Sequence, residues 1–314
     1  MNLSRLLSVG LLGLAVWVYS ANAWGQQEPP TGGVPAHMVV TAEPKHGNEV
    51  PTISQADVMV MEGKDKDTVT DWIPAQGDHA ALELFVLLDD GSSFSLGRQL
   101  DDIKHFVEGQ PATAKIGIAY MQNGIARVEQ NLTSDHAQAA KALRLPMGIR
   151  GVNASPYFSL SDLVKRWPAD NARHEVIMVT DGIDPYYGIG DLEDPYLDAA
   201  IDDSLRAGVI VSAIYNPGVG HFGHDYWLTY WGQNYLAELT DMTGGEGYYL
   251  GMTGSPVAFQ PYLNDLAQRL QHQYWLGFLA KPEKKAGLQR VRVGTEVKGV
   301  DLVAARQVYV QAPQ

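Results

Sequence analysis

The chain has 314 residues, with 36 acidic and 23 basic side chains, a formal net charge of -13, 45% hydrophobic residues and no cysteine. This acidity argues against a nucleic-acid or anionic-lipid partner, because binding phosphates needs a basic surface. The absence of cysteine excludes a disulfide scaffold and a lipoprotein anchored through cysteine. A chain of this length can hold its core by packing alone, as one large domain or one domain with a smaller partner.

Residues 1–23 have the pattern of a secretory signal peptide. Arg5 is the only charged side chain, an apolar run extends from Leu6 to Tyr19, and Ala21-Asn22-Ala23 has the small-x-small form that signal peptidase cuts. A membrane anchor is the alternative, but the run is shorter than the roughly 20 residues that span a bilayer, and glycine and proline follow it. We therefore expect cleavage before Trp24, export, and no membrane insertion of the mature chain.

The next segment changes from a flexible lead to short strands. Residues 24–37 are rich in Gln, Pro and Gly without periodicity, which predicts a lead with no packed structure. Residues 38–80 have strand-like runs separated by polar turns, and a similar β pattern returns in residues 274–314. Because each segment alone has too few strands to bury a face, we expect the two to pair into one small β module.

Residues 81–273 alternate between strands and helices. Leu82–Leu88, Glu175–Thr180 and Gly208–Tyr215 are apolar runs that suit strands covered on both faces. Lys115–Met121 and Gly124–Gln130 flank an Asn-Gly pair, which is a strong hairpin signal. This alternation predicts a doubly wound, mostly parallel α/β sheet with one antiparallel edge strand. Helical spacing predicts helices near residues 96–107, 135–143, 158–166, 195–206, 234–243 and 257–273.

Acidic and hydroxyl side chains follow the central strands. The first central strand ends in Asp89-Asp90-Gly91-Ser92-Ser93, the loop before the third helix contains Ser155, and the second central strand ends in Thr180-Asp181-Gly182. The carboxyl ends of parallel strands meet at one edge of a sheet, so these groups should lie close together. An all-oxygen site of this kind suits a hard cation such as Mg²⁺ or Mn²⁺.

These segments resemble the von Willebrand factor A (vWA) domain, and within it the bacterial proteins that carry a signal peptide and β extensions. The resemblance covers about residues 38–310, and the order of the segments carries it. Phe85–Phe94 matches the family's Asp-x-Ser-x-Ser, Val176–Gly182 its second acidic loop, and Thr243–Gly245 the residues before a short strand. Tyr274–Phe278 and Val291–Val293 look like the close of that family.

The resemblance implies a metal-ion-dependent adhesion site, in which an ion is shared between the domain and a carboxylate of a partner. Carried over by position, the ligands, direct or through water, would be Asp89, Ser93, Asp181 and Ser155, the last of which stands where the family usually has Thr. Gly91 departs from the pattern, since it stands where the first Ser ligand is expected. Water would have to fill that place, so we expect weak binding.

Two alternatives remain open at this site. Asp90 or Ser92 could compensate for Gly91 by a local shift of the loop. Conversely, the site could have decayed, with Asp89 and Asp181 serving as loop and helix caps.

An aromatic run follows the third central strand. Tyr226, Trp227, Tyr230 and Trp231 are expected in the loop at the same edge as Asp181, where exposed Trp and Tyr favour partner recognition. Core packing of the next helix is the competing interpretation for Trp231 and Tyr235.

Other patterns are weaker. Gly218–Gly223 matches G-x-G-x-x-G, but it follows a proline and precedes a bulky aromatic stretch, so nucleotide binding is disfavoured. His221 and His224 are better explained by packing or solvent contact than by a metal. The acidic group after Asp181 could hold a second ion such as Ca²⁺, although solvated loop charge is the favoured interpretation. That group is Asp184, Asp191, Glu193 and Asp194.

No pattern indicates an enzyme. A phosphatase with an aspartyl nucleophile needs a second Asp two positions later, where this chain has Gly91 or Ser92. The chain also lacks G-x-S-x-G, H-E-x-x-H and a P-loop lysine.

The sequence therefore predicts an exported vWA-type binding module, periplasmic or secreted in a bacterium, that recognises a protein or cell-envelope component. Mg²⁺ or Mn²⁺ would bind weakly, and Ca²⁺ is less favoured. The alternative is a structural or scaffold envelope protein with a vestigial metal site.

Overall fold

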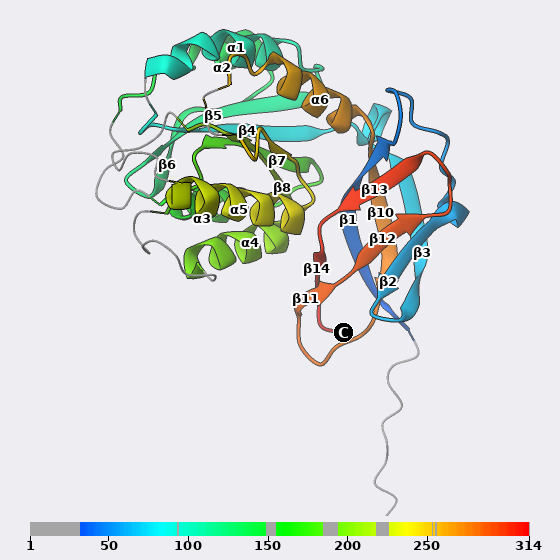
Figure 1. Cartoon of the computed structure of the whole chain (residues 1–314). Helices are drawn as coiled ribbons and strands as arrows, with labels where there is room; N and C mark the ends of the chain where they lie inside the picture. The colour runs from blue at the N-terminus through cyan, green and yellow to red at the C-terminus, as the bar shows by residue number, and fades with distance from the viewer. Residues whose placement is uncertain are drawn as a thin grey trace, which may run out of the picture. The chain divides into compact units, whose positions relative to one another are not determined.

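The computed structural model describes residues 32–92, 94–148, 155–184, 194–217, 226–252, 254 and 256–313 (Figure 1). Residues 32–314 form one compact unit. The predicted signal peptide and its cleavage before Trp24 lie outside the described residues. Within them, each helix is too short or too polar to cross a membrane.

The larger sheet of the described chain is mostly parallel. Its strands are β4 (Leu82–Asp89), β5 (Ala114–Gln122), β6 (Ile125–Thr133), β7 (Arg173–Thr180), β8 (Val209–Tyr215) and β9 (Gly247–Tyr248). They lie in the order β6-β5-β4-β7-β8-β9, and the edge strand β6 runs antiparallel to β5. Asn123 and Gly124 form the intervening turn with positive φ. The predicted doubly wound α/β fold is confirmed.

Helices cover both faces of this sheet, because residues of the buried strands alternate between two apolar cores. Along β4, Leu84 and Val86 pack into one core, whereas Phe85 and Leu87 pack into the other. The first core includes α1 (Leu100–Glu108), α2 (His136–Lys141) and α6 (Gln260–Gln271), and the second includes α3 (Pro156–Arg166), α4 (Pro195–Ala207) and α5 (Tyr226–Thr243) (Figure 1). The 3₁₀ turns are η1 (Gln55–Asp57), η2 (Gly77–His79) and η3 (Phe94–Arg98).

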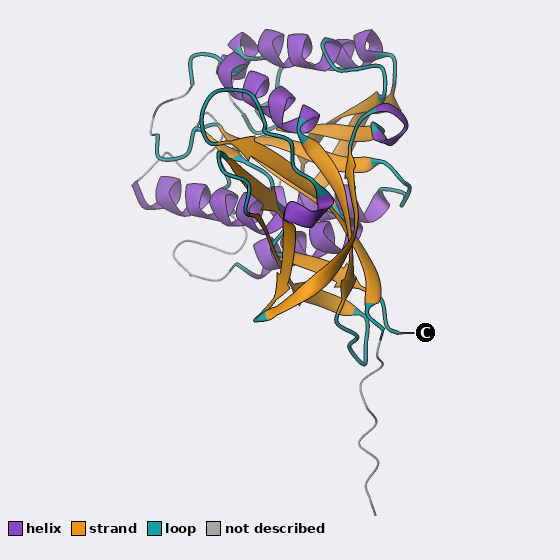
Figure 2. Ribbon diagram, turned by 90° about the vertical axis from the view of Figure 1, so that its right-hand side faces the viewer, coloured by secondary structure: helices purple, strands orange, loops and turns teal. Residues whose placement is uncertain are grey.

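A β module combines strands from both ends of the described chain (Figure 1), and Figure 2 shows strands that extend beyond the helix-covered sheet. Its strands are β1 (Val34–Pro44), β2 (Val58–Glu62), β3 (Asp65–Pro74), β10 (Gln273–Ala280), β11 (Gly287–Arg290), β12 (Arg292–Thr295), β13 (Val300–Ala304) and β14 (Gln307–Val310). One sheet has the order β12-β2-β3-β10-β1-β13, and β11 pairs with β14. Strand β10 thus lies between β1 and β3, although both strands are distant from it in the sequence.

The structure corrects two boundaries of the predicted β segments. Strand β1 begins at Val34, inside residues 24–37, which were predicted to lack packed structure. Val34 and Ala36 are buried opposite Ala280 and Phe278, so the order comes from a distant strand that local composition does not reveal. The predicted C-terminal runs are also divided into shorter strands, because the chain changes sheets near Val291.

A buried polar network joins the β module to the α/β sheet. The Arg173 guanidinium donates to the Leu270 carbonyl at 2.8 Å and to the Gln273 side-chain carbonyl at 2.5 Å. The Gln273 amide donates to Glu175 Oε1 at 2.6 Å and to Thr41 Oγ1 at 3.4 Å. Burial raises the pKa of Glu175 to about 7, against the opposing effects of the Gln273 hydrogen bond and the Arg173 charge.

Candidate functional site at the carboxyl edge of the sheet

Two predicted ligands lie buried at the carboxyl edge of the α/β sheet. Asp89 ends β4 and is 3% exposed, and Asp181 follows β7 and is fully buried. Asp89 accepts hydrogen bonds from the Gly91 amide and from Thr180 Oγ1, each at 2.9 Å. Asp181 accepts one from the Ile183 amide at 3.0 Å. These bonds fix the orientation of both carboxylates.

Ser155 is the N-cap residue of α3 and lies at the same edge of the sheet. Its hydroxyl oxygen accepts from the Phe158 amide at 3.4 Å and donates to Asp184 Oδ2 at 2.5 Å. Tyr157, in the first turn of α3, donates to the Gly182 carbonyl at 2.7 Å and connects α3 to the loop after β7. We call Asp89, Ser155, Asp181 and Asp184 the acidic centre. The fourth predicted ligand, Ser93, lies outside the described residues.

Two of the acidic residues after Asp181, Asp184 and Asp194, are not the solvated loop charges that the sequence favours. Asp184 and Asp194 are 4% and 2% exposed. Asp194 caps α4 by accepting from the amides of Tyr196 and Leu197, and burial raises its pKa. Both are buried because they bind the first residues of helices at the sheet edge: Asp184 accepts from Ser155 at the start of α3, and Asp194 caps α4. The spacing of acidic residues in the sequence does not reveal these contacts. Asp191 and Glu193 lie outside the described residues.

Asp90 does not compensate for Gly91, because both of its oxygens bind groups outside the acidic centre. Oδ1 accepts from Arg144 Nη1 at 2.7 Å and from the Met147 amide at 2.9 Å. Oδ2 accepts from Arg144 Nη2 and Gln122 Nε2, each at 3.1 Å. The buried Asp90 carboxylate therefore positions the loop around Met147.

Ser92 lies on the side of the loop toward β8. Its buried hydroxyl accepts from Asn216 Nδ2 at 3.3 Å, just beyond the end of β8. Ser92 is thus the residue next to Gly91 that supplies a buried hydroxyl group. The glycine-rich segment and His221 and His224 lie outside the described residues.

The aromatic residues lie in the first two turns of α5 rather than in a preceding loop. Tyr226, Trp227 and Tyr230 are 71%, 60% and 46% exposed, whereas Trp231 packs partly against the core. The prediction placed the helix start eight residues late because Gly232 weakens the helical pattern. A Cβ at Gly232 would lie 2.3 Å from the Asp181 carbonyl, so this turn of α5 packs directly against the acidic centre.

The exposed large apolar side chains of the described residues gather around this edge. The β5–β6 turn, the loop held by Asp90, the start of α5 and the loop between β9 and α6 contribute them. Hydrogen bonds from Gln99 to the Val257 carbonyl and from Gln233 to the Met252 carbonyl hold the last loop there. We call this set the apolar rim: Ile125, Leu145, Met147, Tyr226, Trp227, Tyr230, Met252 and Val257.

A second group, which sequence reasoning missed, lies at the opposite edge. Ligand atoms of Glu83, Asp170 and His174 are within 4.8 Å of one another and could hold a metal ion. Protein donors already occupy the Glu83 oxygens, with Lys115 Nζ at 2.9 Å and Trp167 Nε1 at 2.8 Å. Asp170 and His174 are four residues apart, but Glu83 lies far from both in the sequence, so only folding brings the three together.

The side-chain donors of the acidic centre are of the chemical kind that a hard divalent cation prefers. It offers carboxylate and hydroxyl oxygens from the ends of β4 and β7 and the start of α3, without nitrogen or sulfur. Mg²⁺ and Mn²⁺ prefer such ligands.

No known family profile and no curated protein sequence matches the chain. Solved structures do resemble it. An aerotolerance-related membrane protein from Bacteroides fragilis is 17% identical, with 60% of this chain and 98% of that chain covered and a TM-score of 0.43. A von Willebrand factor type A protein from Catenulispora acidiphila is 12% identical, with 91% and 75% covered and a TM-score of 0.44.

A manganese-loaded TRAP protein from Plasmodium vivax is 11% identical, with 72% of this chain and 80% of that chain covered and a TM-score of 0.42. The strand order of the larger sheet, its antiparallel edge strand and its helices on both faces give the chain a vWA-like fold.

Proposed function

We propose that this chain of vWA-like fold is an exported binding module that recognises a protein or cell-envelope partner at the carboxyl edge of its sheet. The observation that carries the proposal is the apolar rim around the acidic centre. Several exposed apolar side chains at one edge of a sheet, beside buried polar groups, are typical of an interaction site.

A divalent ion would be held by Asp89, Ser93, Ser155 and Asp181, and when bound it would supply positive charge to a partner carboxylate. Hydrogen bonds within the chain orient the carboxylates in the absence of an ion. Hydrogen bonds from the Gly91 amide and Thr180 orient Asp89.

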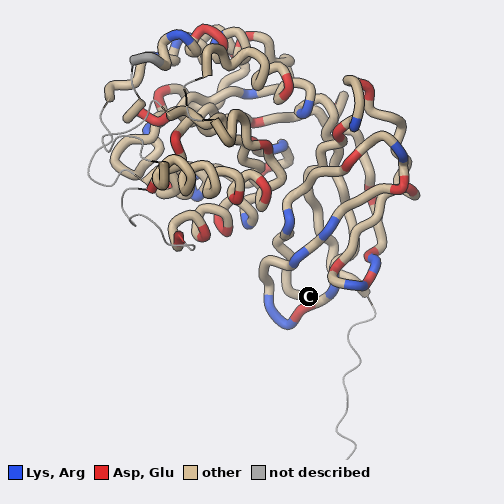
Figure 3. The backbone as a smooth tube through the Cα atoms, in the orientation of Figure 1, with Lys and Arg blue, Asp and Glu red and all other residues tan. Residues whose placement is uncertain are grey.

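The acidic surface makes a nucleic-acid partner unfavourable. Helix α4 contains three acidic residues, Asp198, Asp202 and Asp203, and a single basic residue, Arg206. Figure 3 shows acidic and basic positions along the backbone of the whole chain. Such a surface repels phosphates.

A structural or scaffold protein with a vestigial ion site is the second candidate. Two observations favour it: Gly91 lacks the expected hydroxyl, and the Ser155 hydroxyl already donates to Asp184. A metal must therefore compete with an existing hydrogen bond at Ser155.

Titration of the mature protein with Mn²⁺ by calorimetry separates the two candidates. We expect weak binding by the natural chain, roughly tenfold tighter binding by Gly91→Ser because a ligand hydroxyl is restored, and loss of binding in Asp181→Ala. Asp135→Asn, which changes the exposed cap of α2 at the other edge, is the control and should not alter the titration. If neither the natural chain nor Gly91→Ser binds metal, and Asp181→Ala leaves partner binding unchanged, the ion-bridge mechanism is wrong.

Substitution of Trp227 tests the recognition surface independently of metal. Because Trp227 is 60% exposed, Trp227→Ala should change the free energy of unfolding by less than about 0.5 kcal/mol. It should weaken binding to a partner isolated with the natural chain by at least roughly tenfold, since buried interfacial aromatics dominate binding energy. A binding isotherm and a melting curve measure the two effects, and unchanged affinity would contradict the proposed surface.

A further inference from the structure

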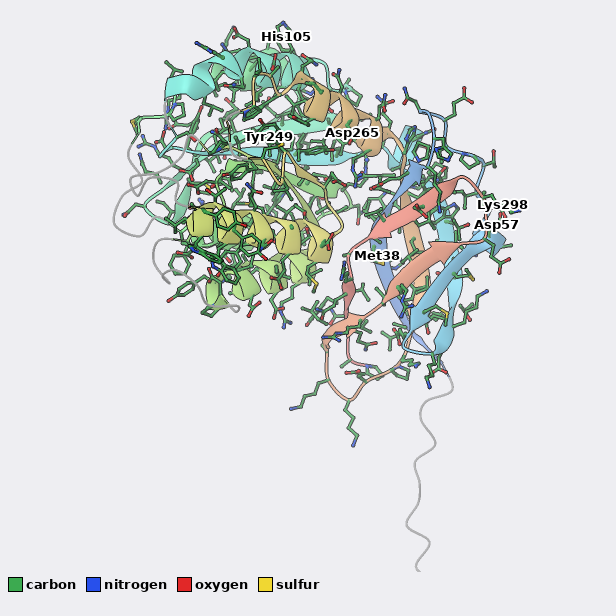
Figure 4. The ribbon with its side chains drawn as sticks, in the orientation of Figure 1. Met38, Asp57, His105, Tyr249, Asp265 and Lys298 are labelled. Atoms are coloured by element: carbon green, nitrogen blue, oxygen red, sulfur yellow. The ribbon has the colours of Figure 1, made fainter. Side chains whose placement is uncertain are left out.

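A cavity of about 750 Å³ lies where the β module meets the α/β sheet, at the edge opposite the acidic centre. The starts of β7 and β8, the end of α4, and strands β1, β10 and β14 line it. In Figure 4, Met38 marks the part of β1 that borders this region. The volume is within the range of small-molecule sites, which often lie between two structural layers or domains. No residue of the acidic centre or of the apolar rim lines this cavity.

The floor of the cavity is a rigid apolar row across three strands of the β module. Trp275 on β10 pairs with Val39 on β1 and with Ile73 on β3, and all three residues line the cavity. Trp275 Nε1 donates to the His79 carbonyl at 3.2 Å, so the indole ring is held in one orientation. A fixed aromatic face of this kind offers a ligand stacking area with little loss of side-chain entropy.

The walls carry planar polar groups. The Arg206 guanidinium lies 5.5 Å from the centre of the Tyr309 ring, and its side chain is 49% exposed. Asp170, 41% exposed, is oriented by hydrogen bonds to its Oδ1 from the Ala172 amide at 2.7 Å and from His174 at 3.0 Å. Carboxylate and guanidinium groups can each bond two adjacent hydroxyls, because both present two parallel bonding positions.

The formal charges in the lining balance. The lining contains two carboxylates, Asp78 and Asp170, and two guanidinium groups, Arg173 and Arg206. The Arg173 guanidinium is also committed to Leu270 and Gln273 in the buried network. A charged ligand would add an uncompensated charge to this lining, whereas a neutral polar ligand would not.

We propose that this cavity binds a neutral carbohydrate unit of one or two sugar rings. The apolar C–H face of a ring stacks on Trp275, and its hydroxyls bond to Asp170 and Arg206. A carbohydrate fits because it combines an apolar face with hydroxyls that both donate and accept. The site is independent of the recognition surface in the proposed function.

Calorimetry on the full mature chain tests this site with maltose, cellobiose and N,N′-diacetylchitobiose as probes. Benzoate and benzylamine serve as charged planar probes of the same cavity. We expect saturable binding of at least one disaccharide with one site per chain. Trp275→Ala should weaken it at least about tenfold, whereas Trp227→Ala, which removes a tryptophan from the apolar rim, should leave it unchanged.

A second variant keeps the test decisive if Trp275→Ala does not fold. Arg206 is half-exposed, so Arg206→Gln should preserve the melting temperature while weakening disaccharide binding several-fold. The proposal is overturned if none of the three disaccharides binds, or if the sensitive variant is Trp227→Ala. It is equally overturned if disaccharide affinity survives in folded Trp275→Ala or Arg206→Gln, or if only a charged probe binds.

Discussion

The two edges of the α/β sheet use buried charge differently. At the carboxyl edge, Asp89 and Asp181 are oriented by amides and a hydroxyl of their own loops, and exposed apolar side chains surround them. At the amino edge, Glu83 pairs with Lys115, and Arg173 donates to Leu270 near the end of α6 and to Gln273 at the start of β10. In the proposed function the carboxyl edge presents its side chains to a partner, whereas the amino edge attaches the β module to the α/β sheet. Three substitutions test this contrast.

The largest effect is expected from breaking the amino-edge network. Arg173→Met should lower the free energy of unfolding by about 3 to 5 kcal/mol, because it leaves buried acceptors at Leu270 and Gln273 without their donor. Urea unfolding measures the loss. Lys45→Met, which breaks an exposed pair with Asp301, is the control and should cost less than about 1 kcal/mol. Equal losses in the two variants would contradict a special role of the buried polar network that joins the β module to the α/β sheet.

A smaller effect is expected from disturbing the carboxyl edge. Gly232→Ala should destabilise the protein by about 2 to 3 kcal/mol, because its Cβ would lie 2.3 Å from the Asp181 carbonyl and force α5 away from the acidic centre. Gly294→Ala has open space at the new Cβ and should have little effect on stability. Thermal unfolding compares the two, and Mn²⁺ titration should show weaker binding only for Gly232→Ala.

The smallest of the three effects depends on pH. Because the pKa of Glu175 is raised from 4.5 to about 7, the folded state keeps a proton that the unfolded state releases. This contribution makes stability fall as the pH rises from about 4.5 through 7. Glu175→Gln should remove it and exceed the natural chain in stability by about 1 to 2 kcal/mol at pH 8, with little difference at pH 4.

Urea unfolding across this pH range measures the difference between the two proteins, which cancels the contributions of other groups. Asp67, whose pKa burial raises to about 6, lies in the β module away from Glu175, and Asp67→Asn should change stability in a lower pH window. A pH-independent difference between Glu175→Gln and the natural chain would contradict the buried, partly protonated carboxyl.

Local sequence patterns predict the elements whose signals are strong. Leu82–Leu88 is apolar throughout because β4 is covered on both faces, and Asn123-Gly124 predicts the hairpin because both positions need positive φ. The same patterns place Asp89 and Asp181 at one edge of the sheet. They fail at Val34 and Tyr226, because β1 is ordered by a distant strand and α5 lacks a clear start signal.

The sequence by itself therefore determined the α/β fold and the edge that carries the acidic centre, since both follow from periodicity and chain direction. Only the tertiary structure decided that Asp90 binds Arg144, that Asp184 and Asp194 are buried, and that Trp275 faces a cavity. Side-chain direction and burial depend on neighbours that are distant in sequence. No local pattern contains those neighbours, because packing brings them together only when the chain folds.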